Sequence, residues 1–425
     1  MDSNQIIIFC IFLVGYALFT VEHVIKLNKT GIALILAAVL WVFVFMLMSA
    51  EEVDVGVRST GAEIAEIVIF LLCAMSLVEV IVHFKFFEWV KYKLLQRGLS
   101  DRKQFYLLAL VTFFTSALLD NLTTTIIIVT IARAFFKPKD IPYVAAGIVV
   151  VANAGGAWSP LGDVTTIMLW VQCKFTASQI VVDTLVPSLV MGLVSTLWLG
   201  RGVANVKSGD EKPVKVVLSK SQKIVIGTAL TGFAFPVIFS SMGVPPFFGL
   251  MLGLGLVWLV IELLGNWSSH TDLTDTKMDN LLRKIDIQSI KFFIGILFCV
   301  GALKEIGILA HLSLDMYGAN ADFYAYIKGS SILGVASSLF DNVPLTAAAM
   351  DIIQTTDFRI WTFTAFTVGT GGSLLLIGSA AGVVAGGMVP SLTFGKYMKV
   401  ATLPVLFGYI AGIAVWLLQN YLFYN

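Results

Sequence analysis

The chain has 425 residues, of which 58% are hydrophobic and only 13% are charged, and its mean hydropathy is +0.89. Such a composition excludes an ordinary soluble domain and predicts an all-α, multi-pass integral membrane protein with one membrane domain over residues 1–425. The net charge of +1 gives no sign of a nucleic-acid partner, so the expected surroundings are the lipid bilayer of a plasma or inner membrane.

Apolar runs of about 17 to 25 residues, each long enough to cross a hydrocarbon core, follow one another along nearly the whole chain. They predict about ten crossing helices, at residues 5–25, 30–49, 61–83, 143–173, 180–200, 224–241, 247–264, 289–309, 360–388 and 401–419. These runs leave no room for a soluble domain.

The region from residue 105 to residue 136 is apolar, but Asp120 and Asn121 interrupt it and basic residues flank both of its ends. Because the two flanks are alike, we expect a re-entrant helical hairpin whose tip is the Asp-Asn pair. Asp341 and Asn342 interrupt residues 326–353 and predict a second hairpin. A carboxylate in a membrane is by default a candidate for an ion path, although helix capping alone would also explain either pair.

A glycine-rich interruption follows each hairpin. The string NAGGAWSPLGD breaks the run at residues 143–173, and TGGSLLLIGSAAG breaks the run at residues 360–388. Three glycines of the first string, Gly155, Gly156 and Gly162, match Gly371, Gly372 and Gly378 of the second, whereas Asp163 matches Ser379. Close helix packing is one explanation of such glycines, but their recurrence in two halves indicates helices broken near the membrane midplane.

The distribution of basic residues predicts the orientation of the chain. Lysine and arginine are concentrated at residues 85–103 and 201–223, which should face the cytoplasm, and the amphipathic stretch 84–99 should lie along that surface. The acid-rich segment 51–58 and the segments 241–246 and 310–323 are expected as outward-facing loops. Ten crossings then leave both termini outside and bring the hairpins in from opposite faces. The expected inverted repeat has the halves 30–200, with hairpin 105–136 and broken helix 143–173, and 247–420, with hairpin 326–353 and broken helix 360–388.

The side chains at the tips and breaks are oxygen donors that suit a small cation such as Na⁺. A carboxylate in a low-dielectric environment can hold either a proton or a metal ion, which would couple the two flows. The predicted ion- or proton-binding residues are Asp120, Asn121, Asn153, Ser159, Asp163, Asp341 and Asn342, with Na⁺ itself at Asp120, Asn121 and Asp163. Weaker candidates are Thr124, Thr346, Thr370, Ser373 and Ser379, together with Glu66 and Glu79, which could relay protons.

The strings SALLDN, NAGGAWSPLGD and FDNVPLT, in this order, resemble those of the NhaD-type Na⁺/H⁺ antiporter family of the ion transporter superfamily. The resemblance covers nearly all of the chain. It implies a secondary active transporter that exchanges Na⁺, or Li⁺, for H⁺, without a cofactor, as a homodimer in which a transport part moves against a scaffold. The second break lacks the proline and the aspartate of the first, so equal ion sites in the two halves are not expected.

Two other functions are compatible with a polytopic chain. A sodium-coupled carboxylate or arsenite carrier would have the same architecture, but no arginine or lysine lies within either tip or either break to bind a carboxylate. A membrane-embedded enzyme is disfavoured because the sequence has no nucleophile-base pair and no histidine-rich metal motif.

Overall fold

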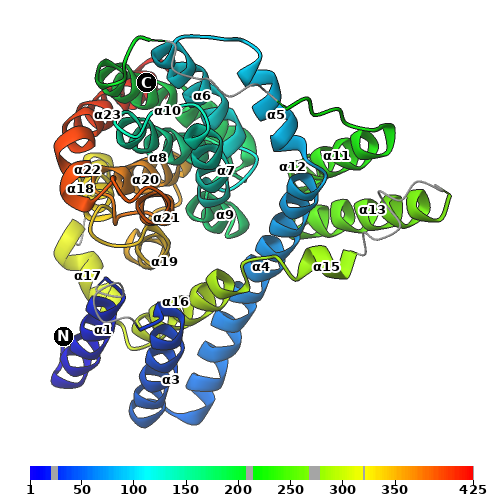
Figure 1. Cartoon of the computed structure of the whole chain (residues 1–425). Helices are drawn as coiled ribbons and strands as arrows, with labels where there is room; N and C mark the ends of the chain where they lie inside the picture. The colour runs from blue at the N-terminus through cyan, green and yellow to red at the C-terminus, as the bar shows by residue number, and fades with distance from the viewer. Residues whose placement is uncertain (21–26, 207–213, 268–277, 319–320, 425) are drawn as a thin grey trace.

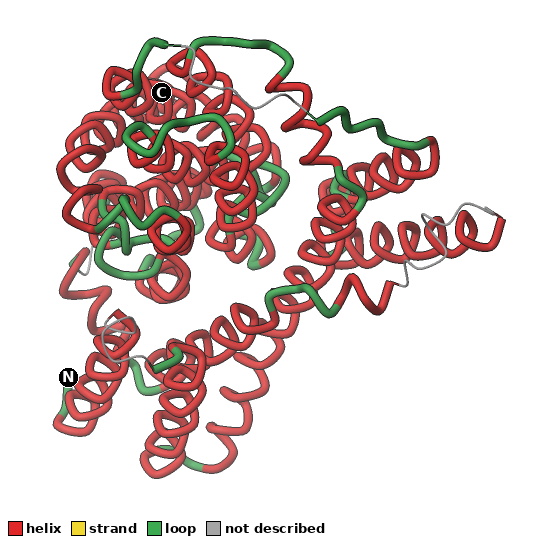
Figure 2. The backbone as a smooth tube through the Cα atoms, in the orientation of Figure 1, coloured by secondary structure: helices red, strands yellow, loops and turns green. Residues whose placement is uncertain are grey.

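The computed structural model describes residues 1–20, 27–206, 214–267, 278–318 and 321–424, and every regular element in these ranges is a helix (Figures 1 and 2). The first helices are α1 (Ser3–Thr20), α3 (Lys29–Leu47), α4 (Ala50–His83), α5 (Phe86–Leu95), α6 (Asp101–Ser116), α7 (Asn121–Arg133), α8 (Ile141–Ala157), α9 (Val164–Val171) and α10 (Ala177–Leu199). The later helices are α11 (Lys220–Gly232), α12 (Phe235–Ser241), α13 (Pro246–Trp267), α15 (Met278–Leu282), α16 (Ile287–Glu305), α17 (Ile308–Tyr317), α18 (Phe323–Ala336), α19 (Asn342–Ile352), α20 (Phe358–Gly371), α21 (Ala380–Met388), α22 (Phe394–Tyr397) and α23 (Leu403–Tyr424). The all-α prediction is thereby confirmed.

Within the described residues, 7 helices are long and apolar enough to cross a membrane. They are Lys29–Leu47, Ala50–His83, Ala177–Gly202, Lys220–Ser241, Pro246–Gly265, Ile287–Glu305 and Phe394–Tyr424. Lipid offers no hydrogen-bond partners to backbone N–H and C=O groups, whereas a helix pairs these groups with one another. Apolar runs of this length therefore form helices. The predicted first span, 5–25, ends beyond α1, in residues that lie outside the described ranges. Residues 207–213 of the predicted basic loop 201–223 also lie outside the described ranges.

Two predicted loops are wrong, because both contain helices. Residues 51–58 belong to α4, which begins at Ala50 because Ser49 and Glu52 form a capping box: each backbone N–H donates to the other side chain. Residues 310–323 include part of α17, since Gly307, at φ +76°, ends the preceding span and starts a new helix. The amphipathic stretch 84–99 contains the helix α5.

The helices form two groups (Figure 1). In the compact group, α6–α10 and α18–α23, the helix α10 packs against α8 and α23, and α20 packs against α8 and α18. In the extended group, α1, α3, α4, α11–α13, α15 and α16, the long helix α4 packs against α11, α13 and α16, and α3 packs against α16. The two groups touch where α16 meets α19 and where α4 meets α9.

Each of the two predicted breaks is present inside the compact group. Residues 158–163 separate α8 from α9, and a short 3-10 turn with the residues after it separates α20 from α21. A Cβ atom on Gly156 would lie 2.5 Å from the carbonyl oxygen of Gly162, and one on Gly372 would lie 2.6 Å from that of Gly378. Both distances are too short for any side chain, so the backbone of each break folds against its own helix only with glycine there. Because α8 and α20 are buried along almost their whole length, the breaks lie in the interior.

Candidate functional site

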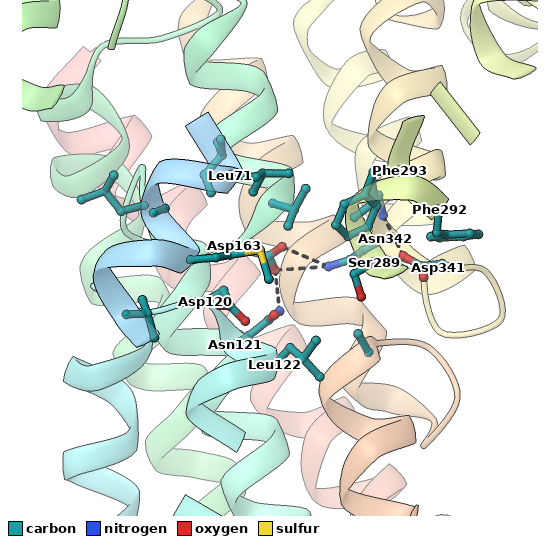
Figure 3. A pocket seen from close by; sticks show the side chains of 18 of the residues that line it. Leu71, Asp120, Asn121, Leu122, Asp163, Ser289, Phe292, Phe293, Asp341 and Asn342 are labelled. Carbon is teal, nitrogen blue, oxygen red and sulfur yellow. Dashed lines mark hydrogen bonds between the residues drawn. The ribbon is translucent and has the colours of Figure 1, made fainter. Parts of the chain in front are cut away.

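A cavity of about 70 Å³ lies between the two helix groups, where both predicted hairpin tips meet the first break (Figure 3). Asp120 and Asn121 line it from the first tip, Asp341 and Asn342 from the second, and Asp163 from the break. Apolar side chains of α4 and α16 close the opposite wall. The cavity has room for a few water molecules or a partly hydrated cation.

Asp163 is the point at which the two tips converge. Its carboxylate is 1% exposed, and it caps α9 by accepting the backbone N–H of Thr165 at 3.1 Å. The Nδ2 atom of Asn121 donates to Oδ2 of Asp163 at 2.9 Å, and the Nδ2 atom of Asn342 donates to the same oxygen at 3.1 Å (Figure 3). Two carboxamides from distant parts of the sequence therefore share one carboxylate.

Asn153 connects this carboxylate to the second break. It is fully buried in α8, and its Oδ1 accepts from Nδ2 of Asn121 at 3.0 Å. Its own Nδ2 donates to the hydroxyls of Ser373 at 2.8 Å and Ser379 at 2.9 Å. Ser373 and Ser379, both predicted as weaker site residues, therefore contribute acceptors to a network that reaches Asp163 through Asn121.

Asp120 and Asp341 both cap helices, as the alternative interpretation of the two tips predicts. Asp120 caps α7 and accepts the backbone N–H and the hydroxyl of Thr123, each at 2.7 Å. Asp341 caps α19 and accepts the backbone N–H of Val343 at 3.1 Å. Both carboxylates also line the cavity, so capping and a role in ion binding are compatible here.

The remaining predicted hydroxyls bond mainly to backbone. Ser159 donates to the carbonyl of Ala117, which ties the first break to the first tip. Thr346 and Thr370 donate to carbonyls in their own helices, at 2.8 Å and 2.6 Å. Thr124 is buried, and its hydroxyl has no hydrogen-bond partner among the described residues.

Glu66 and Glu79 do not line the cavity, although both lie on α4, which forms part of its wall. The carboxylate of Glu79 lies 3.8 Å from the ammonium of Lys284. Neither glutamate belongs to the network around Asp163.

Sequence reasoning missed two residues of the site. Thr165 is fully buried and its backbone N–H donates to Oδ1 of Asp163 at 3.1 Å, and the Asp-x-Thr spacing of a helix cap could have indicated it. Lys29 lines the cavity from α3, with Nζ 3.9 Å from Oδ2 of Asp341. No lysine or arginine lies within the sequence of either tip, but long-range packing places Lys29 next to the second tip.

The two halves repeat their contacts around the breaks. The hydroxyl of Ser116 donates to the carbonyl of Ala152 at 2.6 Å, and that of Ser337 donates to the carbonyl of Val368 at 2.9 Å. The capping residues after the breaks also share one backbone conformation, with φ −145° and ψ 145° at Asp163 and φ −145° and ψ 151° at Ser379. The site therefore combines a repeated backbone with side chains that differ between the halves.

Carboxylate, carboxamide and hydroxyl oxygens are hard ligands that suit alkali and alkaline-earth cations rather than soft metals. Among the described residues, no lysine or arginine forms an ion pair with Asp120 or Asp163. Because an uncompensated carboxylate in an apolar interior is unfavourable, these two groups call for either a proton or a cation.

The chain is similar to known membrane transporters. Residues 16–360 match the family described as "Citrate transporter". The chain is 36% identical to "Sodium/proton antiporter 1" of Arabidopsis thaliana over 420 residues, which cover 96% of this chain and 71% of that protein. It is 35% identical to "Sodium/proton antiporter 2" of the same plant, over 96% of this chain and 98% of that protein. It is also 28% identical to "Na(+)/H(+) antiporter NhaD" of Vibrio cholerae, over 97% of this chain and 91% of that protein.

Proposed function

Because this chain belongs to the citrate transporter family and, within it, to the NhaD-type sodium/proton antiporters, we propose that it exchanges Na⁺ for H⁺ across a membrane. It is a multi-pass membrane transporter rather than an enzyme, and Na⁺ and H⁺ are its proposed cargo. Li⁺ is a second proposed cargo, since a site built from the same hard oxygen ligands also suits the smaller ion.

One observation carries the proposal: Asp163 is a buried carboxylate whose described hydrogen-bond partners are all neutral. Its unit negative charge can be balanced by one proton or by one Na⁺, but a protonated carboxyl group binds Na⁺ only weakly, so the two ions compete. Competition for the same oxygens then couples Na⁺ movement to H⁺ movement in the opposite direction. Asp120, across the cavity, supplies a second carboxylate to the cation.

Asn121 and Asn342 can serve both forms of the site. With their Nδ2 atoms they donate to the Asp163 carboxylate, as the hydrogen bonds at 2.9 Å and 3.1 Å show. Rotation of either carboxamide by half a circle about its Cβ–Cγ bond would direct Oδ1 to this position instead, and Oδ1 is a ligand for Na⁺. Asn153 and the hydroxyls of Thr124 and Thr165 are further oxygen ligands that we propose for the cation.

We also propose the finer architecture expected from the sequence: ten crossings, two re-entrant hairpins, an inverted repeat, both termini outside, and a homodimer. The paired contacts of Ser116 and Ser337, and of Gly156 and Gly372, support the repeat. Labelling of single introduced cysteines from each side of the membrane would test the orientation. Cross-linking in the native membrane would test the dimer.

Purified full-length protein in proteoliposomes tests the exchange. Addition of Na⁺ outside vesicles with an acidic, dye-loaded interior should raise the internal pH in the absence of any organic substrate. Li⁺ should act in the same way, and choline, whose methyl groups keep oxygen ligands away from its charge, should not. Failure of Na⁺ to move protons at any pH from neutral to alkaline would contradict the proposal.

A sodium-coupled carboxylate or arsenite carrier is the second candidate, and two observations favour it. The matched family is described by the name of a carboxylate carrier, and Lys29 gives the cavity one ammonium that could contact an anion. In the same vesicles this function requires uptake of labelled citrate or arsenite that depends on Na⁺. Proton movement driven by Na⁺ alone, with no such uptake, would exclude it.

A further inference from the structure

Lys29 joins the two helix groups at the second tip. It is the first residue of α3, in the extended group, and its Nζ lies 3.9 Å from Oδ2 of Asp341, at the start of α19 in the compact group. The ammonium also lies 4.4 Å from the ring centre of Phe292 on α16. The Lys29 and Asp341 side chains are 31% and 23% exposed, so the pair is partly shielded from solvent.

The Lys29–Asp341 pair lies where two cavities meet. Both residues line the cavity that contains Asp163, and both line a second cavity of about 70 Å³ whose wall includes Tyr16 and Ser379. The backbone N–H of Asp341 donates to the hydroxyl of Tyr16 at 3.0 Å, which holds this tip against α1. A cation that approached Asp341 from either cavity would therefore meet the ammonium of Lys29.

The position of Lys29 in its own helix is electrostatically unfavourable. The first turn of a helix carries the positive end of the backbone dipole, which favours an acidic side chain and disfavours a lysine. Asn28 already caps α3, with its side chain accepting the backbone N–H of Thr30 at 2.9 Å. Local helix chemistry thus gives no reason for a cation here, whereas the carboxylate of Asp341 does.

The carboxylates of the first half have no comparable partner. Asp120 accepts hydrogen bonds from Thr123, and Asp163 accepts them from two carboxamides and a backbone N–H. In the described chain neither forms an ion pair with a basic residue. Asp120, Asp163 and Asp341 all line the cavity that contains Asp163, and among these described carboxylates Asp341 is the one paired with a basic side chain.

We propose that the ammonium of Lys29 is the resident counter-ion of Asp341 and excludes a transported cation from the second tip. The chain then binds one Na⁺, at Asp163 and Asp120, although its repeated architecture offers two tips. Lys29 is in this sense a residue that sets the ion stoichiometry. The inference rests on the proposed function, since it assumes that Na⁺ binds in this cavity.

Equilibrium binding of radioactive Na⁺ to the purified full-length chain tests the inference. The wild-type chain should bind one Na⁺, and Lys29→Gln should bind a second one, because Asp341 loses its counter-ion. Lys29→Arg keeps the charge and should bind one. The double variant Lys29→Gln with Asp341→Asn should return to one, which attributes the added ion to Asp341.

Three results would overturn the inference. One is a Lys29→Gln chain that folds and still binds one Na⁺, and another is a wild-type chain that binds two. The third result applies if Lys29→Gln fails to fold, and it uses Asp341→Asn alone. This variant should still bind one Na⁺. If it binds none, Asp341 is a ligand of the transported Na⁺ and the inference is wrong. A wild-type chain that binds no Na⁺ overturns the proposed function as well, so the two failures are distinguishable.

Discussion

The first and second halves of this chain build the same backbone around their breaks and give it different charges. At the break of the first half, Asp163 caps α9, whereas at the break of the second half Ser379 caps α21 with the same backbone angles. At the tips, Asp120 accepts hydrogen bonds from the backbone and hydroxyl of Thr123, whereas Asp341 faces the ammonium of Lys29.

This difference indicates that the halves cooperate in one site rather than forming two. The second half contributes neutral groups to the first: Asn342 donates to Asp163, and Ser373 and Ser379 accept from Asn153. Asp341, the carboxylate that the described second half contributes to the cavity, is already paired with Lys29. Both breaks and both acid-amide pairs supply oriented backbone and amide groups, whereas the carboxylates without a described ion pair, Asp120 and Asp163, lie in one half.

Replacement of Asp163 by asparagine should have the largest effect, because it makes the first break as neutral as the second. Asparagine also caps helices, so α9 should stay intact. A charge pair about 4 Å apart contributes about 4 kcal/mol at an effective dielectric constant of 20, so we expect Na⁺ affinity to fall by about 100-fold or more. Na⁺ binding and Na⁺-driven proton movement in vesicles would measure the loss.

The matched control for this change is Asp322→Asn. Asp322 caps α18 by accepting the backbone N–H of Ala325 at 2.7 Å, and it does not line the cavity. This variant should exchange Na⁺ at the wild-type rate. Normal Na⁺ affinity in Asp163→Asn would remove Asp163 from the mechanism, and with it the asymmetry between the two breaks.

Asn153→Ala should have the second-largest effect, since Asn153 is the side chain that links the two halves. Its removal deprives Asn121 of an acceptor and Ser373 and Ser379 of a donor. Loss of a group that orients cation ligands typically lowers affinity by about 10- to 100-fold. Buried polar groups left without partners should destabilise the fold by about 1–3 kcal/mol, which thermal unfolding in detergent would detect.

Ser379→Ala provides the comparison within this network, because it removes one acceptor and leaves Asn153 in contact with Asn121 and Ser373. We expect a smaller loss than in Asn153→Ala, in both Na⁺ affinity and stability. Equal losses in the two variants would mean that Ser379 itself contacts the cation, and that the second break has a site of its own.

Much of this architecture follows from the sequence, because it depends on local features. The lengths of the apolar runs predict the membrane helices, and the glycines of the two breaks predict where helices stop. The acid-amide pairs predict the tips, and the side chains of Asp163, Asn121 and Asn342 do meet. Each of these features is contained in a short segment and is repeated in a second one.

Contacts between distant segments could not be predicted in the same way. Lys29 precedes an apolar run by one residue, and nothing in that position indicates which carboxylate it faces once α3 packs beside α16, which in turn contacts α19. The segment 51–58 looks like a loop because it is acidic, but the capping box at Ser49 and the ion pair of Arg58 with Asp54 at 2.7 Å stabilise it as a helix.

Gly369→Ala should have a moderate effect that probes the space beside the carboxylate. A Cβ atom on Gly369 would lie 3.7 Å from Oδ2 of Asp163 and 3.6 Å from the hydroxyl of Thr165, both ordinary contact distances. The protein should therefore fold, but a methyl group would occupy space beside the carboxylate oxygen that accepts from both tips. We expect the KM for Na⁺ to rise by about threefold to tenfold, or about 0.6–1.4 kcal/mol.

Gly192→Ala is the control for an added methyl group in the compact group. Its Cβ would lie 3.9 Å from side-chain atoms of Ala154 and Val151, away from the cavity, so Na⁺ transport should not change. If Gly369→Ala leaves the KM for Na⁺ at the wild-type value, the cation does not approach Asp163 from the side of α20. The contribution of the second half would then be limited to Asn342 and the two serines.

Glu79→Gln should have the smallest effect, although glutamate on a membrane helix is a candidate proton carrier. Glu79 pairs at 3.8 Å with a lysine side chain that is 56% exposed, and such pairs contribute about 0–1 kcal/mol. We therefore expect exchange rates within about twofold of wild type, with Glu66→Gln as the matched variant on the same helix. A proton flux that falls in either variant while Na⁺ binding stays normal would mean that protons reach Asp163 along α4. In that case the difference between the halves would account for cation binding alone, because the proton pathway would also use α4 of the extended group.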